Sequence, residues 1–442
     1  MSEGVTPVRY AVVGTGSRAD MYVDALATRF PANAQLVALC DTNETRMRVH
    51  NRRLGEQHGL AALPTYAPAD FTEMLTRERV DAVMVCTTDS AHDDYLVATV
   101  EAGLRAVTEK PMTTDVEKAR RILAAQQRTG GRIEVTFNYR YNPVHQRVRE
   151  LLAEQVIGDV GSVHFEWLLD VQHGADYFRR WHRNRENSGG LLVHKSSHHF
   201  DLVNWWLDDA PDSVVGLGNL FFYGAEGGAR NGYAKDYLRA AGSQAAATDP
   251  FALDMAASPR LTELYLDAEH EDGYQRDRNV FAGDIDIEDD MSVLARYRGG
   301  ASLTYQLTAY APYEGYRVSF NGTKGRLELD VLENDYARSP LEHGSRMGVS
   351  PGSVEEVAPT RTAITLRPLF QPAEVLLDEP MRPGHGGGDD LMLDALFGPP
   401  AADPLGLRAD HIAGARALAI GLAATKSFGT GGLVRIGDLL PI

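Results

Sequence analysis

The chain has 442 residues, too many for one typical core, and 43% of them are hydrophobic and 24% charged, so we expect a globular protein of two domains. The formal net charge of −17 disfavours nucleic acid and anionic membranes as partners. The two cysteines, Cys40 and Cys86, end apolar runs and make a disulfide framework or a cysteine zinc site improbable. Because no apolar run is long enough to span a membrane and the N-terminus lacks a signal-peptide pattern, we expect a cytoplasmic protein.

Residues 1–138 alternate short apolar runs with helical patterns, the rhythm of a βαβ fold. Buried strands are predicted at 8–14, 34–41, 80–88, 105–111 and 132–140. Helices are predicted at 18–30, 44–59, 91–103 and 113–131, the last of them with a threonine cap. This order predicts an N-terminal doubly wound α/β domain.

Residues 139–442 have a different pattern, which predicts an α/β domain with an open, mostly antiparallel sheet. A strand is predicted at 161–173, and hairpin turns are predicted over Gly299–Gly300 and over Asn321–Gly322. Residues 224–288 show weak periodicity and predict an inserted excursion that serves as a lid or an oligomer contact. An alanine-rich helix and a short strand end the chain.

The stretch from Gly14 to Ala19 reads G-x-G-x-x-A and lies between a predicted strand and a predicted helix. In a dinucleotide site Gly14 makes the tight turn, and Gly16 lets a pyrophosphate approach the backbone. An ordinary glycine turn is the alternative. Asp41 ends the second strand, where an acid holds ribose hydroxyls and repels the extra phosphate of NADP. The predicted cofactor is therefore NAD, and the alternative for Asp41 is a helix cap.

Glu109-Lys110-Pro111 ends the fourth predicted strand and, with the glycine motif, resembles the Gfo/Idh/MocA oxidoreductase family. "FNYRYNP" (137–143), the glycine pair 189–190 and "FNGTKGRLE" (320–328) extend the resemblance over most of the chain. The resemblance implies a Rossmann domain, an α/β domain with an open sheet, a nicotinamide cofactor that is often retained through turnover, and a sugar or polyol substrate. It also implies a homo-oligomer built on the outer face of the open sheet.

The resemblance assigns Lys110 to the catalytic site. An ammonium at the C-terminal end of a strand can hydrogen-bond a substrate hydroxyl and stabilise a developing alkoxide, whereas the alternative is a surface lysine before a proline. The residues expected to bind the cofactor are Gly14, Gly16, Ser17, Arg18, Asp41, Thr87, Glu109 and Lys110.

Residues 189–206 crowd three histidines and a lysine before a tryptophan-rich helix. In many members of the family an aspartate and, four residues on, a histidine follow the glycine pair; here the two positions hold His194 and His198. Because residues four apart share a helix face, His198 is the predicted general base, with His194 passing on the proton or binding a substrate oxygen. Lys110 and Tyr139 are the other candidates for the base, and Asp201 is expected either to orient a histidine or to serve the helix.

A zinc site is the rival interpretation of His194 and His198, but no cysteine is near and the family works without a metal, so no metal is expected. The remaining alternative, hydrogen-bonded structural histidines, applies above all to His199.

Four arginines surround Trp181 and His182 in "YFRRWHRNRENSGG" (177–190). The arginine fork suits carboxylate, sulfonate or phosphate, so the cluster predicts an anionic sugar; a solvated loop or a clamp on the protein's own acids is the alternative. The residues expected to bind substrate are Lys195, Arg179, Arg180, Arg183, Trp181 and His182, and His385 is a further candidate for the site.

The leading hypothesis is transient oxidation of a pyranose hydroxyl at carbon 3, loss of the aglycone and return of the hydride. The sum is redox-neutral hydrolysis of an anionic glycoside such as a sulfoquinovoside, as in one branch of the family. The alternative is net dehydrogenation of a sugar or polyol by NAD. A third possibility is an NAD-binding sensor without catalysis, because a fold does not dictate function.

Overall fold

The computed structural model describes residues 6–337, 360–381 and 386–442. The chain divides into two compact units, each assembled from three segments. Unit 1 comprises Met1–Phe137, Met255–Gln275 and Asp389–Gly414, and unit 2 comprises Asn138–Asp254, Arg276–Gly388 and Ala415–Ile442. Two segments that the sequence analysis assigned to the second domain, 255–275 and 389–414, thus cluster with unit 1.

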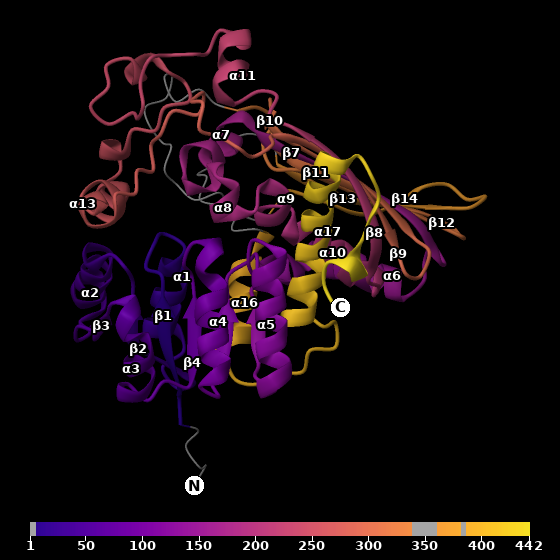
Figure 1. Ribbon diagram of the computed structural model, residues 1–442. Coiled ribbons are helices and arrows are strands. Elements are labelled where there is room, and N and C mark those ends of the chain that lie inside the picture. The colour runs from indigo at the N-terminus through magenta and orange to yellow at the C-terminus, as the bar shows by residue number, and fades with distance from the viewer. Residues whose placement is uncertain (1–5, 338–359, 382–385) are drawn as a thin grey trace. The chain divides into compact units, whose positions relative to one another are not determined.

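Unit 1 is built on a seven-stranded sheet of order β15-β6-β5-β4-β1-β2-β3. Figure 1 labels its strands β1, β2, β3 and β4. All strands run parallel except β15, which pairs antiparallel with β6, and the predicted Rossmann sheet is confirmed. The strands are β1 (Val8–Val13), β2 (Ala34–Cys40), β3 (Thr65–Tyr66), β4 (Ala82–Val85), β5 (Arg105–Thr108), β6 (Ile133–Val135) and β15 (Ala409–Asp410). The helices include α1 (Ala19–Asp24), α2 (Glu44–His58), α3 (Phe71–Arg77), α4 (His92–Glu101), α5 (Val116–Thr129) and α16 (Gly388–Phe397).

The helix caps of unit 1 follow from the sequence with one correction. Asn43 caps α2, and Gly59 ends it in the left-handed conformation that favours glycine. The cap of α5 is Asp115 rather than a threonine, because the Asp115 carboxylate accepts the Lys118 N–H at 2.9 Å. An aspartate is an equally good cap, so the helix begins two residues later than the threonine pair indicated.

Unit 2 is built on a nine-stranded sheet of order β14-β13-β12-β11-β7-β10-β9-β8-β16. Its only parallel neighbours are β7 and β10, so the described sheet is mostly antiparallel, as predicted. The strands are β7 (Val160–Asp170), β8 (Pro211–Asn219), β9 (Asp290–Tyr297), β10 (Ser302–Ala311), β11 (Gly315–Gly322), β12 (Gly325–Leu332), β13 (Arg361–Pro368), β14 (Glu374–Glu379) and β16 (Val434–Arg435). The main helices are α6 (Pro143–Ala153), α7 (Val171–Arg179), α8 (Arg185–Ser188), α9 (Leu191–His194), α10 (Ser197–Leu207), α11 (Gly224–Asn231) and α17 (His411–Thr430), of which α17 begins in unit 1.

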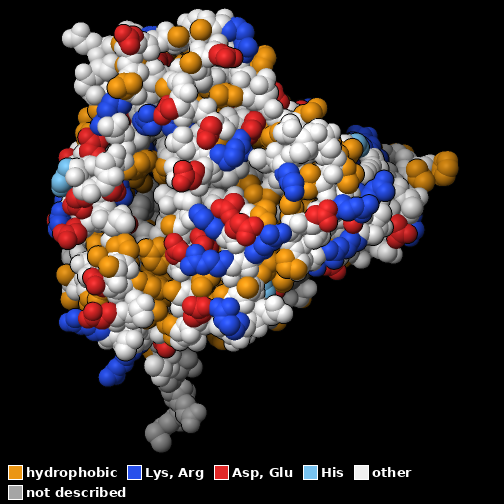
Figure 2. All heavy atoms as spheres, in the orientation of Figure 1, with side chains coloured by type: hydrophobic (Ala, Val, Ile, Leu, Met, Phe, Trp, Pro, Cys, Tyr) orange, Lys and Arg blue, Asp and Glu red, His pale blue; other side chains and the backbone are white. Residues whose placement is uncertain are grey.

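The two faces of this sheet differ. Along β7, Val163, Phe165, Trp167 and Leu169 are buried, while the alternate residues point to the other face, which we call the outer face. On the inner side α7 packs against β7 and β10. Acidic and basic side chains are interspersed over the surface that Figure 2 shows, in keeping with the many arginine–carboxylate pairs of the chain.

Two predicted boundaries in unit 2 are wrong. Gly322 pairs with Gly325, so the hairpin turns over Thr323–Lys324 rather than over Asn321–Gly322, because the ladder continues two residues further. The predicted strand 161–173 ends at Asp170, whose carboxylate accepts the N–H groups of Gln172 and His173 at 2.8 and 2.9 Å and so starts α7. In the described residues, no helix is long and apolar enough to cross a membrane.

Candidate functional site

The glycine turn of unit 1 joins β1 to α1. Gly14 has φ +84°, and a Cβ atom there would come within 2.5 Å of the Thr87 nitrogen and 2.6 Å of Cys86 backbone atoms. Only glycine fits this close approach between the ends of β1 and β4. The predicted cofactor residues Gly14 and Thr87 are therefore neighbours.

Asp41 follows β2 and faces the same turn. One carboxylate oxygen accepts the Thr15 N–H at 2.5 Å and the Thr15 hydroxyl at 2.8 Å, and the other accepts the Asn43 N–H at 2.9 Å. Asp41 is not the cap of α2, because Asn43 fills that role by accepting the Arg46 N–H at 3.1 Å. Binding of ribose by Asp41 stays a prediction.

Glu109 and Arg18, both predicted to bind the cofactor, contact each other. The Glu109 carboxylate accepts hydrogen bonds from Arg18 Nε at 2.5 Å, from the Tyr22 hydroxyl at 2.6 Å and from its neighbour Lys110 N at 3.2 Å. Burial opposes ionisation, but Arg18 and Lys110 outweigh it and lower the pKa of Glu109. Lys110 follows β5 and is joined to Pro111 by a cis peptide bond. Because β1, β4 and β5 are adjacent, Gly14, Thr87 and Lys110 lie along the carboxyl-end edge of one sheet.

In unit 2, four rings form what we call the histidine–tryptophan cluster: Tyr177, Trp181, His182 and His194. His182 stacks on Trp181 at 3.6 Å between centroids and meets His194 edge to face at 4.1 Å. Tyr177 contacts His182 and His194 at 5.4 and 5.5 Å. Three residues predicted from separate parts of the sequence motif, Trp181, His182 and His194, are thus brought together.

A second group of predicted residues gathers around Trp167. His198 stacks on Tyr139 with centroids 4.6 Å apart, and Tyr139 in turn stacks on Trp167 at 5.8 Å. Lys195 Nζ lies 4.9 Å from the Trp167 ring and 5.9 Å from the Tyr139 ring, within the range of cation–π attraction. Tyr139, His198 and Lys195 therefore belong to one neighbourhood.

Sequence reasoning missed the acids around Lys195, which we call the lysine–carboxylate cluster: Lys195, His173, Glu314, Glu333 and Asp170. His173 Nδ1 lies 2.7 Å from the Glu314 carboxylate, and the Tyr177 hydroxyl lies 3.3 Å from His173 Nε2, which joins this cluster to the histidine–tryptophan cluster. The Glu333 N–H donates to the Glu314 carbonyl at 2.9 Å. The signal was available: in the hairpin of β11 and β12, Gly315 opposes Leu332, which places the two flanking glutamates side by side.

The groups of the lysine–carboxylate cluster shift one another's pKa values. Burial lowers the pKa of Lys195, and Glu314 and Glu333 oppose that shift. Burial would raise the pKa of Glu314, but His173 and Lys195 reverse the effect and lower it. Burial and the neighbouring Glu314 raise the pKa of Glu333. Of the three carboxyl groups, Glu314 thus has a lowered pKa, whereas burial and Glu314 raise the pKa values of both Glu333 and Asp170.

The relation between the histidines differs from the prediction. His194 ends α9 and His198 lies in the first turn of α10, with Lys195 and Ser196 between the two helices. The two side chains therefore do not share the face of one continuous helix, and they contact different rings. Asp201 receives two hydrogen bonds from Arg140, at 2.7 and 2.6 Å, so its carboxylate serves that buried pair.

His199 has the surroundings of a structural histidine. Its Nδ1 lies 2.7 Å from the Tyr305 hydroxyl, and its ring stacks on Trp167 at 4.1 Å between centroids. The side chain is fully buried, in agreement with the structural alternative.

The arginines near Trp181 contact the protein's own acids and carbonyls. Arg180 pairs with Asp176 at 2.9 Å, Arg183 with Asp284 at 2.6 Å and Arg185 with Glu288 at 2.7 Å. Arg179 is buried and donates to the Phe251 carbonyl at 2.8 Å. These contacts match the alternative of a clamp on the protein's own acidic groups, and they leave the anionic-sugar interpretation without structural support.

Within the described ranges, no group of three or more His, Cys, Asp or Glu side chains is arranged to hold a metal ion. His385, a further candidate from the sequence, lies outside the described residues.

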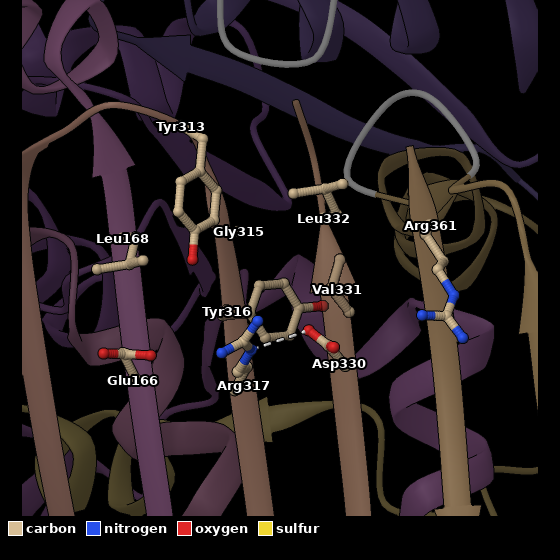
Figure 3. Close-up of a pocket in the computed structure, with 10 residues that line it drawn as sticks. All are labelled: Glu166, Leu168, Tyr313, Gly315, Tyr316, Arg317, Asp330, Val331, Leu332 and Arg361. Carbon is tan, nitrogen blue, oxygen red and sulfur yellow. Dashed lines mark hydrogen bonds and ion pairs between the residues drawn. The ribbon is translucent and has the colours of Figure 1, made fainter. Parts of the chain in front are cut away.

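A pocket of about 210 Å³ lies on the outer face of the nine-stranded sheet (Figure 3). Its walls come from β7, β11, β12 and β13, with Glu166 and Leu168 on one side and Arg361 on the other. Arg317 and Asp330 face each other across it at 3.3 Å. The predicted site residues of unit 2 do not line this pocket, which is a feature of the sheet surface rather than of the chemistry.

Models of known protein families match both units of the chain. The model described as "Oxidoreductase family, NAD-binding Rossmann fold" matches residues 8–137, and the model described as "Oxidoreductase family, C-terminal alpha/beta domain" matches residues 149–436. A putative oxidoreductase of Bacillus subtilis, YteT, is 36% identical over 420 residues, which cover 93% of this chain and 92% of the relative. An inositol 2-dehydrogenase of Rubrobacter xylanophilus is 24% identical over 213 residues, 47% of this chain and 54% of that protein.

The chain is also similar in fold to solved structures. The WlbA dehydrogenase of Bordetella pertussis, in complex with NADH and UDP-GlcNAcA, aligns with a TM-score of 0.62 at 19% identity and covers 99% of this chain and 100% of that one. Aldose-aldose oxidoreductase of Caulobacter crescentus aligns with a TM-score of 0.61 at 17% identity, covering 97% of this chain and 100% of that chain.

The fold and the matched domains define an NAD(P)-dependent oxidoreductase. The chain belongs to the Gfo/Idh/MocA oxidoreductase family, with its Rossmann N-terminal and α/β C-terminal domains.

Proposed function

We propose that this protein is an NAD-dependent dehydrogenase that oxidises a hydroxyl of a sugar or sugar-like polyol. Relatives named as an inositol 2-dehydrogenase and a D-apiose dehydrogenase support the substrate class. The observation that carries the proposal is the gathering in unit 2 of Tyr139, His198 and Lys195 beside an ionised carboxylate and an aromatic floor. Sugars are commonly held by hydrogen bonds from such polar groups and by apolar contact with rings.

The choice of NAD over NADP rests on Asp41. A carboxylate at the end of β2 attracts the ribose hydroxyls and repels a 2′-phosphate.

When bound, the nicotinamide supplies the acceptor for a hydride from the substrate carbon. In the proposed mechanism Lys110 or His198 takes the hydroxyl proton. His198 is held flat against Tyr139, and an ammonium such as that of Lys110 can stabilise a developing alkoxide. Lys195 donates hydrogen bonds to other hydroxyls of the sugar, and Glu314 fixes the orientation of His173 at 2.7 Å.

The hydrolytic hypothesis was placed first because of the support from the arginine cluster. Because Arg180, Arg183 and Arg185 are paired with Asp176, Asp284 and Glu288, that support is lost. The relatives named above are oxidoreductases and dehydrogenases. We therefore place the net dehydrogenase ahead of the redox-neutral glycosidase.

The test is nicotinamide absorbance with NAD and a panel of myo-inositol, neutral aldoses, a UDP-sugar and an alkyl sulfoquinovoside. We expect NADH to form with at least one neutral sugar or polyol. Lys110→Met and His198→Asn should lower kcat by roughly 10²- to 10⁴-fold, the usual worth of a positioned acid–base group. Lys324→Met, a change at an exposed turn, is the matched control.

Two other results would replace the proposal. In deuterated water, proton NMR would establish the glycosidase if the aglycone were released, the freed sugar carried deuterium at carbon 2 and no net NADH formed. Binding of NADH without turnover of any sugar would favour the sensor.

The outer face of the nine-stranded sheet is the proposed contact with a second copy of the chain. Leu294 on β9 is about half exposed there, and Leu217 on β8 is 70% exposed. Val215 pairs with Leu294 across the two strands and Leu217 lies two residues further on, so the two leucines are neighbours in one apolar patch. Leu294→Glu should lower the molar mass measured by light scattering. An unchanged mass would mean that this face is not the contact between copies.

A further inference from the structure

Residues Met255–Gln275, which we call the strap, belong to unit 1 although they are far along the chain from the rest of it. Four ion pairs or hydrogen bonds fasten the strap to helices α1 and α2, which flank the glycine turn and Asp41. The contacts are Arg260 with Asp20, Glu263 with Arg52 at 2.7 Å, Asp272 with Arg46 at 2.7 Å, and Glu271 with the Thr45 N–H at 3.1 Å.

Tyr265 places its hydroxyl on the glycine turn itself. The Tyr265 oxygen accepts the Ser17 N–H at 2.9 Å and lies 2.8 Å from the Ser17 hydroxyl. It is also the atom nearest to Gly16, 3.4 Å from the position that a Cβ there would take. The Arg46 guanidinium lies over the Tyr265 ring at 5.4 Å from the centroid and helps to hold it.

The Tyr265 hydroxyl lies in the space that the second glycine of a dinucleotide motif leaves open for a pyrophosphate oxygen. One backbone N–H has one proton to donate, so the Tyr265 hydroxyl and a phosphate oxygen compete for Ser17 N–H. A phosphate oxygen also cannot share the space next to Gly16 that the hydroxyl fills.

The contacts of the strap leave one buried hydrogen-bond donor without a partner. Arg46 is buried, and its Nη2 has no hydrogen-bond partner among the described residues. An unsatisfied buried donor costs free energy, so it lowers the stability of the strap in this position.

We propose that the strap guards the nucleotide site, with the Tyr265 hydroxyl occupying the Ser17 N–H until a dinucleotide displaces it. The strap then controls how fast the cofactor enters. The proposal rests on nucleotide binding by unit 1 and does not depend on which sugar is oxidised.

The experiment measures NADH binding to the full chain, with the Kd from a fluorescence titration and the association rate from stopped flow. Tyr265→Phe keeps the ring on Arg46 and removes the competing oxygen. We expect its association rate to rise and its Kd to fall by about fivefold, close to the worth of one neutral hydrogen bond. Glu271→Gln should also speed association, because it weakens a fastening of the strap while leaving the Tyr265 hydroxyl intact.

Tyr274→Phe is the matched control, since it removes a hydroxyl from the same strap and its ring packs edge to face against Tyr265 at 5.8 Å. Its association rate should equal that of the wild type. The proposal is overturned if Tyr265→Phe binds NADH more weakly, which would make the hydroxyl a cofactor ligand, or if it binds at the wild-type rate. Failure of the wild-type chain to bind any dinucleotide would instead overturn the proposed function.

Discussion

Removal of the Asp201 carboxylate should destabilise unit 2 severely. Asp201 on α10 and Arg140 are 1% and 8% exposed, and they share two hydrogen bonds of 2.6 and 2.7 Å. Asp201→Ala leaves a buried guanidinium without these two charge-assisted bonds. A loss of this kind costs about 3–5 kcal/mol, and at roughly 2–4 °C per kcal/mol a loss of ~4 kcal/mol lowers Tm by about 8–16 °C.

Thermal unfolding and urea titration, followed by circular dichroism, measure the effect. The double variant Arg140→Met, Asp201→Leu should be more stable than Asp201→Ala, because it leaves no buried charge uncompensated. Asp330→Ala is the control, since it breaks an arginine–carboxylate pair whose side chains are 65% and 49% exposed and should cost under about 1 kcal/mol.

The reasoning is refuted if Asp201→Ala unfolds within about 1 kcal/mol of the wild type, or if the double variant is no better than the single one. A stable Asp201→Ala protein with lost activity would revive the idea that this carboxylate orients a catalytic histidine.

Two further predictions concern the cofactor turn and the lysine–carboxylate cluster. Gly14→Ala puts a Cβ within 2.5 Å of the Thr87 nitrogen and should weaken NADH binding by at least about tenfold, whereas Gly103→Ala, at a similar φ but with nothing within 4 Å, should bind NADH normally; equal affinities would contradict the role given to the turn. Burial and a neighbouring carboxylate raise the pKa of Glu333, so its protonated form favours folding and that stability is lost as the pH rises from about 5 to about 8. In urea titrations over this range Glu333→Gln should flatten the pH dependence by on the order of 1–2 kcal/mol, and a slope unchanged from the wild type would count against the shifted pKa.

Motifs with local geometry were predictable from the sequence. The glycine turn and Asp41 were assigned because each lies at the end of a buried parallel strand, and the carboxyl ends of such strands meet at one edge. Lys110 was assigned through the family resemblance, and it too follows such a strand. The hairpins were also predictable from the sequence. The second turn was misplaced by two residues, because the ladder extends to Gly322, which pairs with Gly325.

Contacts between distant segments were not predictable in this way. The arginine cluster suggested an anionic ligand, because nothing in the local sequence shows that Arg183 and Arg185 meet Asp284 and Glu288 about 100 residues later. Tyr265 was hidden for the same reason, since the strap has no periodicity that links it to Ser17. Glu314 and Glu333 could have been paired from the hairpin register once the turn was placed correctly.

The three-segment construction of unit 1 has a consequence for the order in which the chain can fold during synthesis. Phe397 on α16 packs against Tyr10 and Tyr22 at 5.0 and 6.4 Å between ring centroids, and β15 covers the edge of β6. A nascent chain that has emerged only as far as residue 138 exposes those rings and an unpaired strand edge, both of which invite misassembly. The Rossmann unit therefore reaches its finished form only after nearly the whole polypeptide has left the ribosome, and the sheet of unit 2 has largely been translated by then.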